Sequence, residues 1–270
     1  MTSRCLQGVE WAAEPQGRED SVDTCHGNKQ YYYVTGTNPD VGIMVIHDLL
    51  GWTFPNTRLL ADYYAAEVGA TVYVPDFFGG EVLPRALVTS GAFDALGLPS
   101  FLRRNPKTAR GPEMASFARF LRGRHRRLGA IGFCYGGWGV FHVGQAMACV
   151  HSARDDSDAL LPLVDCISTA HPSLLEMEEM RRVGVPVQIL APERDVAFTE
   201  ELKAFALAEI PKLSVPFDYQ IFPGLEHGFA VRGDPEVENE VRGMERAKRA
   251  AVAWFREWLV HGEEERTGGA

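Results

Sequence analysis

The sequence predicts an α/β fold in which a mainly parallel sheet is covered by helices on both faces. Short apolar runs rich in β-branched and aromatic residues alternate along the chain with stretches that carry apolar residues at helical spacing. Such alternation is typical of parallel strands, because each needs a long crossover connection to its neighbour. The chain shows neither an internal repeat nor a linker between two halves, so we expect a single domain over residues 1–270.

Seven apolar runs predict the strands, and most have the continuous apolar character of strands buried on both faces. In chain order these runs are 31–34, 42–47, 71–75, 128–133, 166–170, 185–190 and 218–222. Helical spacing predicts helices in the stretches 55–68, 113–121, 136–149, 199–209 and 237–259.

Two segments depart from this alternation. Residues 81–112 combine several Gly and Pro residues with apolar side chains such as Phe93 and Leu102, but contain no clear strand. Since a connection of this length is usually functional, we expect a lid-like insertion that closes over a binding site. The acidic, Gly-rich end, 261–270, is expected to be a flexible tail.

Composition and charge restrict the partners of the protein. Lys and Arg total 27 against 36 Asp and Glu, a net charge of -9, which argues against nucleic acid because phosphate binding needs clustered cations. The N-terminus lacks an apolar signal core, and no apolar run approaches the roughly 18 residues of a membrane span. The five cysteines have no C-x-x-C spacing, which indicates a reducing compartment. We expect a cytoplasmic monomer or homodimer with no nucleic-acid or membrane partner.

The clearest chemical motif is GFCYG (132–136), which lies between an expected strand and an expected helix. This G-x-nucleophile-x-G turn holds its central residue, here Cys134, in a strained conformation and leaves no room for side chains two positions away. The N-terminus of the following helix favours the thiolate form of a cysteine. Cys149 and Cys166 lie in an expected helix and an expected strand, so we interpret them as inert core thiols.

A cysteine nucleophile needs a base, and the base needs an acid that orients it. Asp195 comes just after the expected strand 185–190, and His227 comes just after the strand 218–222. Both therefore lie at the carboxyl edge of the sheet, where sites in such folds form. The competing acids are Asp165 and Asp76, each near a strand.

Two further histidines, His47 and His171, follow expected strands. Their positions fit either side chains that line a pocket or structural side chains. Neither has a partner at metal-ligand spacing, and His47 and Asp48, as neighbours on a strand, point apart. A metal site is therefore not expected.

Several motifs resemble those of the dienelactone hydrolase family of α/β-hydrolases, especially its fungal branch. They are HDLLGW (47–52), VPDFFGG (74–80), GFCYGG (132–137), AHPS (170–173), the Asp195 loop and EHGFAVRGD (226–234). The resemblance implies an α/β-hydrolase fold and a carboxylic ester hydrolase that opens lactones or cleaves esters. It also implies a catalytic triad of Cys134, Asp195 and His227, which follow one another in the chain order of that fold.

The resemblance has departures at the positions that would meet the substrate. Family members with well-understood lactone chemistry carry a glutamate that interacts with the nucleophile's thiol, where this chain has the shorter Asp48. They also hold the substrate carboxylate with two arginines, and here Gly79-Gly80 stands at the first position. Arg85 and Arg232 are the candidate replacements. We therefore expect an aromatic or polyketide-like lactone or ester rather than a small dienelactone carboxylate.

In the expected mechanism, a thiolate forms a thioester with the substrate, and no cofactor or metal is required. The backbone N–H groups of Tyr135 and Leu49 are expected to form the oxyanion hole. Two alternatives stay open: a non-hydrolytic lyase or cyclase of a tailoring pathway that uses the same pocket, and a ligand-binding protein on a hydrolase scaffold. The complete order of nucleophile, acid and histidine argues against the second, because a receptor does not need all three.

Overall fold

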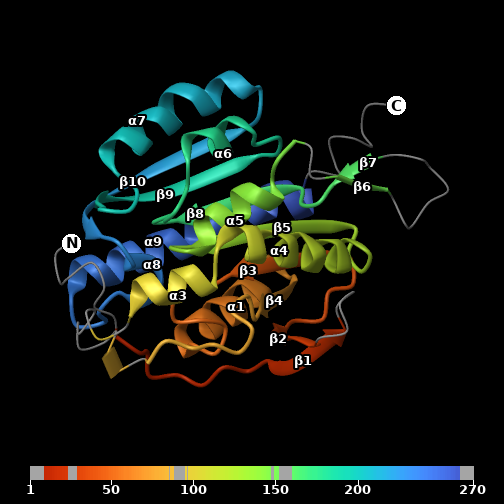
Figure 1. Cartoon of the computed structure of the whole chain (residues 1–270), viewed down its shortest axis with the longest axis horizontal. Helices are drawn as coiled ribbons and strands as arrows, with labels where there is room; N and C mark the ends of the chain where they lie inside the picture. The colour runs from red at the N-terminus through yellow and green to blue at the C-terminus, as the bar shows by residue number, and fades with distance from the viewer. Residues whose placement is uncertain are drawn as a thin grey trace.

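The computed structural model describes residues 9–23, 29–84, 86–87, 95, 97–146, 149–151 and 160–261, and in this part of the chain eight strands form one sheet (Figure 1). Their spatial order is β1-β2-β4-β3-β5-β8-β9-β10. The first two neighbouring pairs are antiparallel and all later pairs are parallel, which confirms the expected mainly parallel sheet. The strands are β1 (Arg18–Asp23), β2 (Lys29–Thr35), β3 (Val41–Ile46), β4 (Thr71–Pro75), β5 (Arg127–Phe133), β8 (Cys166–Ala170), β9 (Val187–Arg194) and β10 (Phe217–Glu226).

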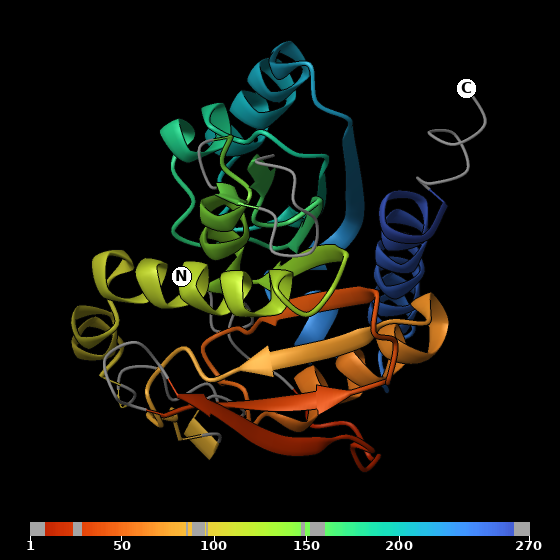
Figure 2. The same cartoon turned by 90° about the vertical axis from the view of Figure 1, so that its right-hand side faces the viewer.

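Helices cover both faces of this sheet, as Figures 1 and 2 show. Helices α1, α8 and α9 pack on one face, and α3 to α7 pack on the other. The helices are α1 (Pro55–Val68), α3 (Leu98–Arg104), α4 (Lys107–Arg122), α5 (Gly136–Val143), α6 (Met177–Arg181), α7 (Glu200–Glu209), α8 (Phe229–Arg232) and α9 (Glu238–Phe255). A 3-10 turn (Ile210–Leu213) follows α7, and a π-helical turn (Arg256–Val260) extends α9.

The all-apolar character of the central strands follows from this double cover. Along β3, Met44 and Ile46 belong to the hydrophobic cluster under α3 to α7, whereas Ile43 and Val45 belong to the cluster under α1, α8 and α9. Because successive strand residues point to opposite faces, a strand buried on both faces needs apolar residues at every position. The two clusters thus fix the register of the sheet and the place of its carboxyl edge.

The elements that the sequence analysis missed are charged, exposed or short. Strand β1 has the sequence REDSVD and is mostly exposed at the edge of the sheet, so no apolar run marks it. The expected helix 136–149 is too long: α5 ends at Val143, and Cys149 opens a short strand, β6 (Cys149–His151), paired with β7 (Leu160–Pro162). Gly144 caps the helix, and the backbone N–H of Ala146 already bonds to the carbonyl of Arg182.

The second half of the insertion 81–112 contains helices that its Gly and Pro content does not predict. Residues 98–104 form α3, and α4 begins at Lys107 rather than at the expected residue 113. Phe101 of α3 is fully buried and packs edge-to-face on Phe78, with the ring centres 4.7 Å apart. Phe93 of the expected lid and residues 262–270 of the expected tail lie outside the described residues.

No helix in the described part of the chain combines the length and the apolar character that crossing a bilayer requires.

Candidate active site

Cys134 occupies the turn between β5 and α5, at the carboxyl edge of the sheet. Its φ of 51° lies in the left-handed region, which is strained for a residue with a side chain. A Cβ on Gly132 would collide with the carbonyl of Gly136, and a Cβ on Gly136 would collide with the carbonyl of Ile46. Both glycines are therefore required for the turn, for the steric reason that the motif predicts.

The structure brings Asp195 and His227 together with Cys134. Asp195 directly follows β9, and His227 directly follows β10, the next strand in the sheet. The Nδ1 atom of His227 lies 2.9 Å from each carboxylate oxygen of Asp195. Asp195 Oδ1 also accepts the backbone N–H groups of Ala197 and Phe198, at 2.8 and 3.1 Å. The carboxylate is thus fixed by its own loop and in turn fixes the imidazole.

The electrostatics of the site favour a thiolate–imidazolium pair. Burial alone raises the pKa of the Cys134 thiol, but the positive charge of His227 and a hydrogen bond with it outweigh burial, so this pKa lies below the ordinary 9.0. Burial alone lowers the pKa of His227, but the Cys134 thiolate and the hydrogen bond to Asp195 raise it well above the ordinary 6.5. The two shifts have the same cause, which is the attraction between neighbouring opposite charges.

Cys166 has the opposite environment. It is fully buried in β8, and burial raises its pKa well above that of an ordinary thiol. Such a thiol stays protonated at neutral pH and reacts slowly, as expected for a core cysteine.

A cavity of about 350 Å³ opens on Cys134. Apart from the reacting groups and two side chains with hydroxyls, its lining is aliphatic. The lining residues are Leu49, Leu98, Leu102, Cys134, Tyr135, Ser173, Leu174, Leu175, Val196, Ala197 and His227. Leu98 and Leu102 belong to α3, so the insertion 81–112 does reach the site.

A second cavity, of about 490 Å³, lies on the other side of His227. Its lining is polar and includes Arg194, Glu226, Arg232 and Asp234, but not Cys134. Since the smaller cavity reaches Cys134, the predicted nucleophile, and the larger one does not, the smaller cavity is the candidate substrate site.

Asp48 and Arg232 pair with each other rather than lining the smaller cavity. Arg232 Nε lies 3.1 Å from Asp48 Oδ2, and the two side chains are 4% and 1% exposed. Asp48 Oδ1 also accepts the backbone N–H of Leu50 at 2.9 Å. Their charges act on the thiol at a distance, with Arg232 lowering the pKa of Cys134 and Asp48 raising it. Neither residue is among those that line the smaller cavity, so their expected role in binding the substrate stays a prediction.

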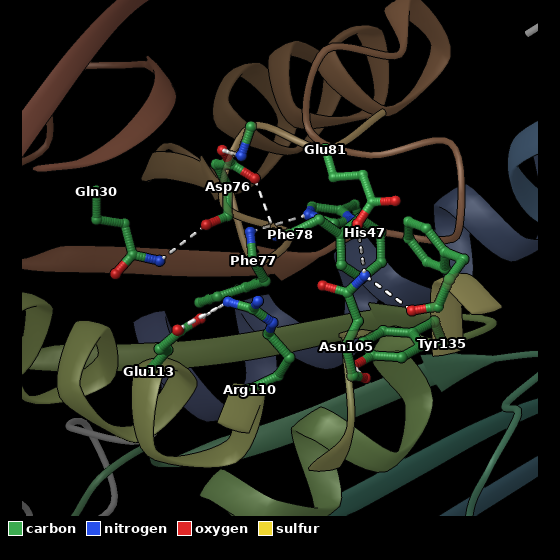
Figure 3. Close-up of polar contacts among 12 residues, drawn as sticks. Gln30, His47, Asp76, Phe77, Phe78, Glu81, Asn105, Arg110, Glu113 and Tyr135 are labelled. Atoms are coloured by element: carbon green, nitrogen blue, oxygen red, sulfur yellow. Dashed lines mark hydrogen bonds and ion pairs between the residues drawn. The ribbon is translucent and has the colours of Figure 1, made fainter. Parts of the chain in front are cut away.

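His47 is structural in this arrangement and does not line the cavity. It is fully buried; its Nδ1–H donates to the carbonyl of Asp48 at 2.8 Å, and its Nε2 accepts the N–H of Phe77 at 3.3 Å. The ring packs edge-to-face on Phe78, as the close-up in Figure 3 shows. These contacts fix the backbone that presents Leu49 to the cavity.

His171 also lies behind the site rather than in the cavity lining. It is fully buried and packs edge-to-face on the His227 ring, with the ring centres 4.9 Å apart. Burial, followed by the charges of His227 and Arg232, holds its pKa well below the usual value, so the ring is neutral. Arg85, the other candidate for a substrate carboxylate, lies outside the described residues.

The two competing acids have other partners. Asp165 pairs with Arg122 at 2.9 Å and with Arg127 at 3.5 Å. It directly precedes β8 and therefore lies at the edge of the sheet opposite the carboxyl edge. Asp76 accepts the backbone N–H groups of Phe78 and Gly80 within its own turn. Neither is hydrogen bonded to His227 in the described structure.

A polar connection that the sequence analysis missed joins the insertion to the nucleophile turn. Figure 3 shows Glu81, Asn105 and Tyr135 close together. The Nδ2 group of Asn105 donates to Glu81 at 3.2 Å, and the hydroxyl of Tyr135 donates to the carbonyl of Asn105 at 2.8 Å. Asn105 sits between α3 and α4, so these bonds fix both helices relative to the nucleophile turn.

Ser173 is the second site residue that the sequence analysis missed. Its hydroxyl lies 3.3 Å from the sulfur of Cys134. It stands three residues after the end of β8, the strand between β5 and β9, and this place at the carboxyl edge is the signal that would have revealed it.

Comparisons with known proteins agree on one family. The model of the dienelactone hydrolase family matches residues 30–259. The chain is 28% identical to the hydrolase tropI of Talaromyces stipitatus, over 95% of this chain and 96% of that protein. It is 26% identical to a carboxymethylenebutenolidase homolog of Mus musculus, over 84% and 87% of the two chains.

Solved structures share the fold. A dienelactone hydrolase-like promiscuous phosphotriesterase from metagenomic libraries matches with a TM-score of 0.64 at 18% identity, over 90% of this chain and 99% of that one. A dienelactone hydrolase from Anabaena variabilis matches with a TM-score of 0.63 at 16% identity, over 92% and 100% of the chains. These likenesses confirm the expected α/β-hydrolase architecture.

Proposed function

The chain belongs to the dienelactone hydrolase family and is a hydrolase, and from that premise we propose that it opens lactones or cleaves carboxylic esters through a thioester on Cys134. The observation that carries the proposal is the geometry of the base. His227 is held by both oxygens of Asp195 at 2.9 Å, and it shares an apolar cavity with a thiol whose pKa it lowers.

In the acylation step, the Cys134 thiolate attacks the carbonyl carbon and the carbonyl π electrons move to the oxygen. The N–H groups of Tyr135 and Leu49 stabilise this oxyanion, and one such donor typically contributes on the order of 3 kcal/mol. Collapse of the tetrahedral intermediate re-forms the carbonyl as a thioester and expels the alkoxide. The alkoxide takes the Nε2 proton of the His227 imidazolium, which becomes neutral.

In the deacylation step, neutral His227 takes a proton from water while the water oxygen attacks the thioester carbonyl. The second tetrahedral intermediate expels the Cys134 thiolate and releases the carboxylic acid, so the ion pair is restored. The Asp195 carboxylate accepts a hydrogen bond from Nδ1–H throughout and stabilises the imidazolium. No other reactant is consumed.

The lining of the cavity supports an aromatic or polyketide-like substrate without a carboxylate. Among the described lining residues, Cys134 and His227 are the side chains that can carry a charge, and seven of the others are aliphatic. The guanidinium of Arg232 is engaged by Asp48 and faces the other cavity. A buried substrate carboxylate would therefore have no cation for a partner among the described lining residues beyond the catalytic imidazolium, which is costly in an apolar site.

Rapid quenching with a panel of aryl esters and aromatic lactones, followed by intact-mass analysis, tests the proposal. We expect an acyl adduct that maps to the Cys134 peptide, loss of turnover and adduct in Cys134→Ala, and full activity in the control Cys166→Ala. Product formation by Cys134→Ala without an adduct would favour the lyase or cyclase alternative. Saturable binding without any product would favour a binding protein.

A further inference from the structure

One polar group touches both reacting side chains and has no part in the triad. The hydroxyl oxygen of Ser173 lies 3.3 Å from the sulfur of Cys134 and 3.4 Å from Nε2 of His227. Both distances are within hydrogen-bond range for these pairs of atoms. The hydroxyl thus lies within hydrogen-bond reach of both Cys134 and His227.

The loop that carries Ser173 is held in an unusual conformation. His171 and Leu174, on either side, have φ angles of 41° and 58°, in the left-handed region that residues with side chains rarely adopt. The backbone N–H of Ser173 donates to the carbonyl of Cys134 at 2.7 Å, and that of His171 donates to the carbonyl of Leu190 at 3.1 Å. Strained backbone of this kind persists where the surrounding structure determines it, and it concentrates at functional sites.

A hydroxyl can satisfy both neighbours at once, because it is one donor and an acceptor. In the ion-pair state, Nε2–H of His227 can be shared between the thiolate and the Ser173 oxygen, while the Ser173 hydroxyl donates to the thiolate. We propose that Ser173 is a further catalytic residue, whose hydroxyl bridges the Cys134 sulfur and the His227 imidazole and stabilises the thiolate. This inference rests on the proposed role of Cys134 as the nucleophile.

The substitution Ser173→Ala isolates the hydroxyl. Alanine keeps the backbone N–H that bonds to Cys134, so the loop retains its anchor. The other groups that act on the thiol stay in place: His227 after β10, Arg232 of α8 and Asp48 after β3. A change in thiol ionisation between the two proteins therefore reports the hydroxyl itself.

The test measures alkylation of Cys134 by iodoacetamide against pH, with peptide mass spectrometry to separate it from the other cysteines. A hydrogen bond to a charged group corresponds to roughly one pH unit in ionisation, so we expect the midpoint of Ser173→Ala to rise by about one unit. Its alkylation rate below the midpoint, and kcat/KM there, should fall about tenfold. Ser173→Thr, which keeps a hydroxyl, should restore the wild-type midpoint.

The matched control is Ser168→Ala, which removes a buried hydroxyl of β8 that donates to Gln188. It should leave the midpoint unchanged, and thermal unfolding of every variant confirms that each one folds. An unchanged midpoint and an unchanged pH profile of kcat/KM in folded Ser173→Ala would overturn the inference. So would a shift of equal size in Ser168→Ala. Because alkylation needs no substrate, this outcome is separate from turnover by Cys134→Ala, which would overturn the proposed function instead.

Discussion

Removing the guanidinium of Arg232 should cost much more stability than neutralising its partner, Asp48. The two groups form an ion pair at 3.1 Å, with side chains 4% and 1% exposed. They differ in access to water, since Arg232 lines the polar cavity and Asp48 lines neither of the two cavities described above. In Asp48→Asn the remaining guanidinium can be hydrated, whereas in Arg232→Met the remaining carboxylate is enclosed.

The magnitude follows from the distance and the burial. At 3.1 Å and an effective dielectric constant of about 20, the attraction is about 5 kcal/mol before desolvation is subtracted. Breaking a buried pair from one side typically costs about 3 to 5 kcal/mol. We expect Arg232→Met to lower the free energy of unfolding by about 4 kcal/mol. Asp48→Asn should cost about 1 to 2 kcal/mol, and so should the double variant, which leaves no unpaired charge.

Urea unfolding at neutral pH, followed by tryptophan fluorescence, measures the four corners of this double-mutant cycle. The expected coupling, which is the sum of the two single costs minus the cost of the double variant, is favourable and about 4 kcal/mol, because the carboxylate no longer needs a partner once it is neutral. A cost of Asp48→Asn equal to that of Arg232→Met would refute the argument from water access. Simple addition of the two costs in the double variant would refute the ion pair.

Three further outcomes follow from the site. Asp195→Asn should lower kcat about 10⁴-fold, because an amide favours the wrong imidazole tautomer. Asp165→Asn should instead lower the midpoint of unfolding and leave kcat near wild type. The reverse pattern in steady-state assays would reassign the acid. The value of kcat/KM should rise with pH through the pKa of Cys134, which lies below 9.0, and fall again through the pKa of His227, which lies above 6.5. A profile that begins to rise only above pH 9 would contradict the ion pair. Leu102→Asp should raise KM for an aromatic lactone at least tenfold, because the carboxylate enters an apolar lining, and the result to look for against it is an unchanged KM.

The meeting of Cys134, Asp195 and His227 at one edge of the sheet could be predicted because each residue carries a local signal. Cys134 has the glycine spacing of its turn, and Asp195 and His227 each follow an apolar strand, so the topology of the sheet brings them to one edge. The sheet itself could be predicted for the same reason, since strands buried on both faces are apolar throughout. Edge strand β1 could not be predicted, because it pairs with β2 on one side only and most of its side chains are exposed, so it needs no apolar run.

The roles of the flanking residues depended on contacts that no local pattern contains. Asp48 and Arg232 are 184 positions apart in the chain, and their pairing is visible only in the folded structure. His47 has both ring nitrogens occupied by backbone groups, one of which comes from the turn after β4. Ser173 has no motif around it beyond its strand end, and its importance comes from two neighbours that arrive from β5 and β10.

The thiol of Cys134 acquires its reactivity from a residue that is synthesised much later. His227 supplies the charge and the hydrogen bond that lower the pKa of this thiol. Until β9 and β10 have joined the sheet, Cys134 is an ordinary protonated cysteine. Since oxidants attack the thiolate rather than the thiol, we expect the growing polypeptide on the ribosome to be less sensitive to oxidation at this position than the folded protein. The sensitivity of Cys134 to peroxide should therefore begin only when the fold is complete and His227 lies beside the thiol.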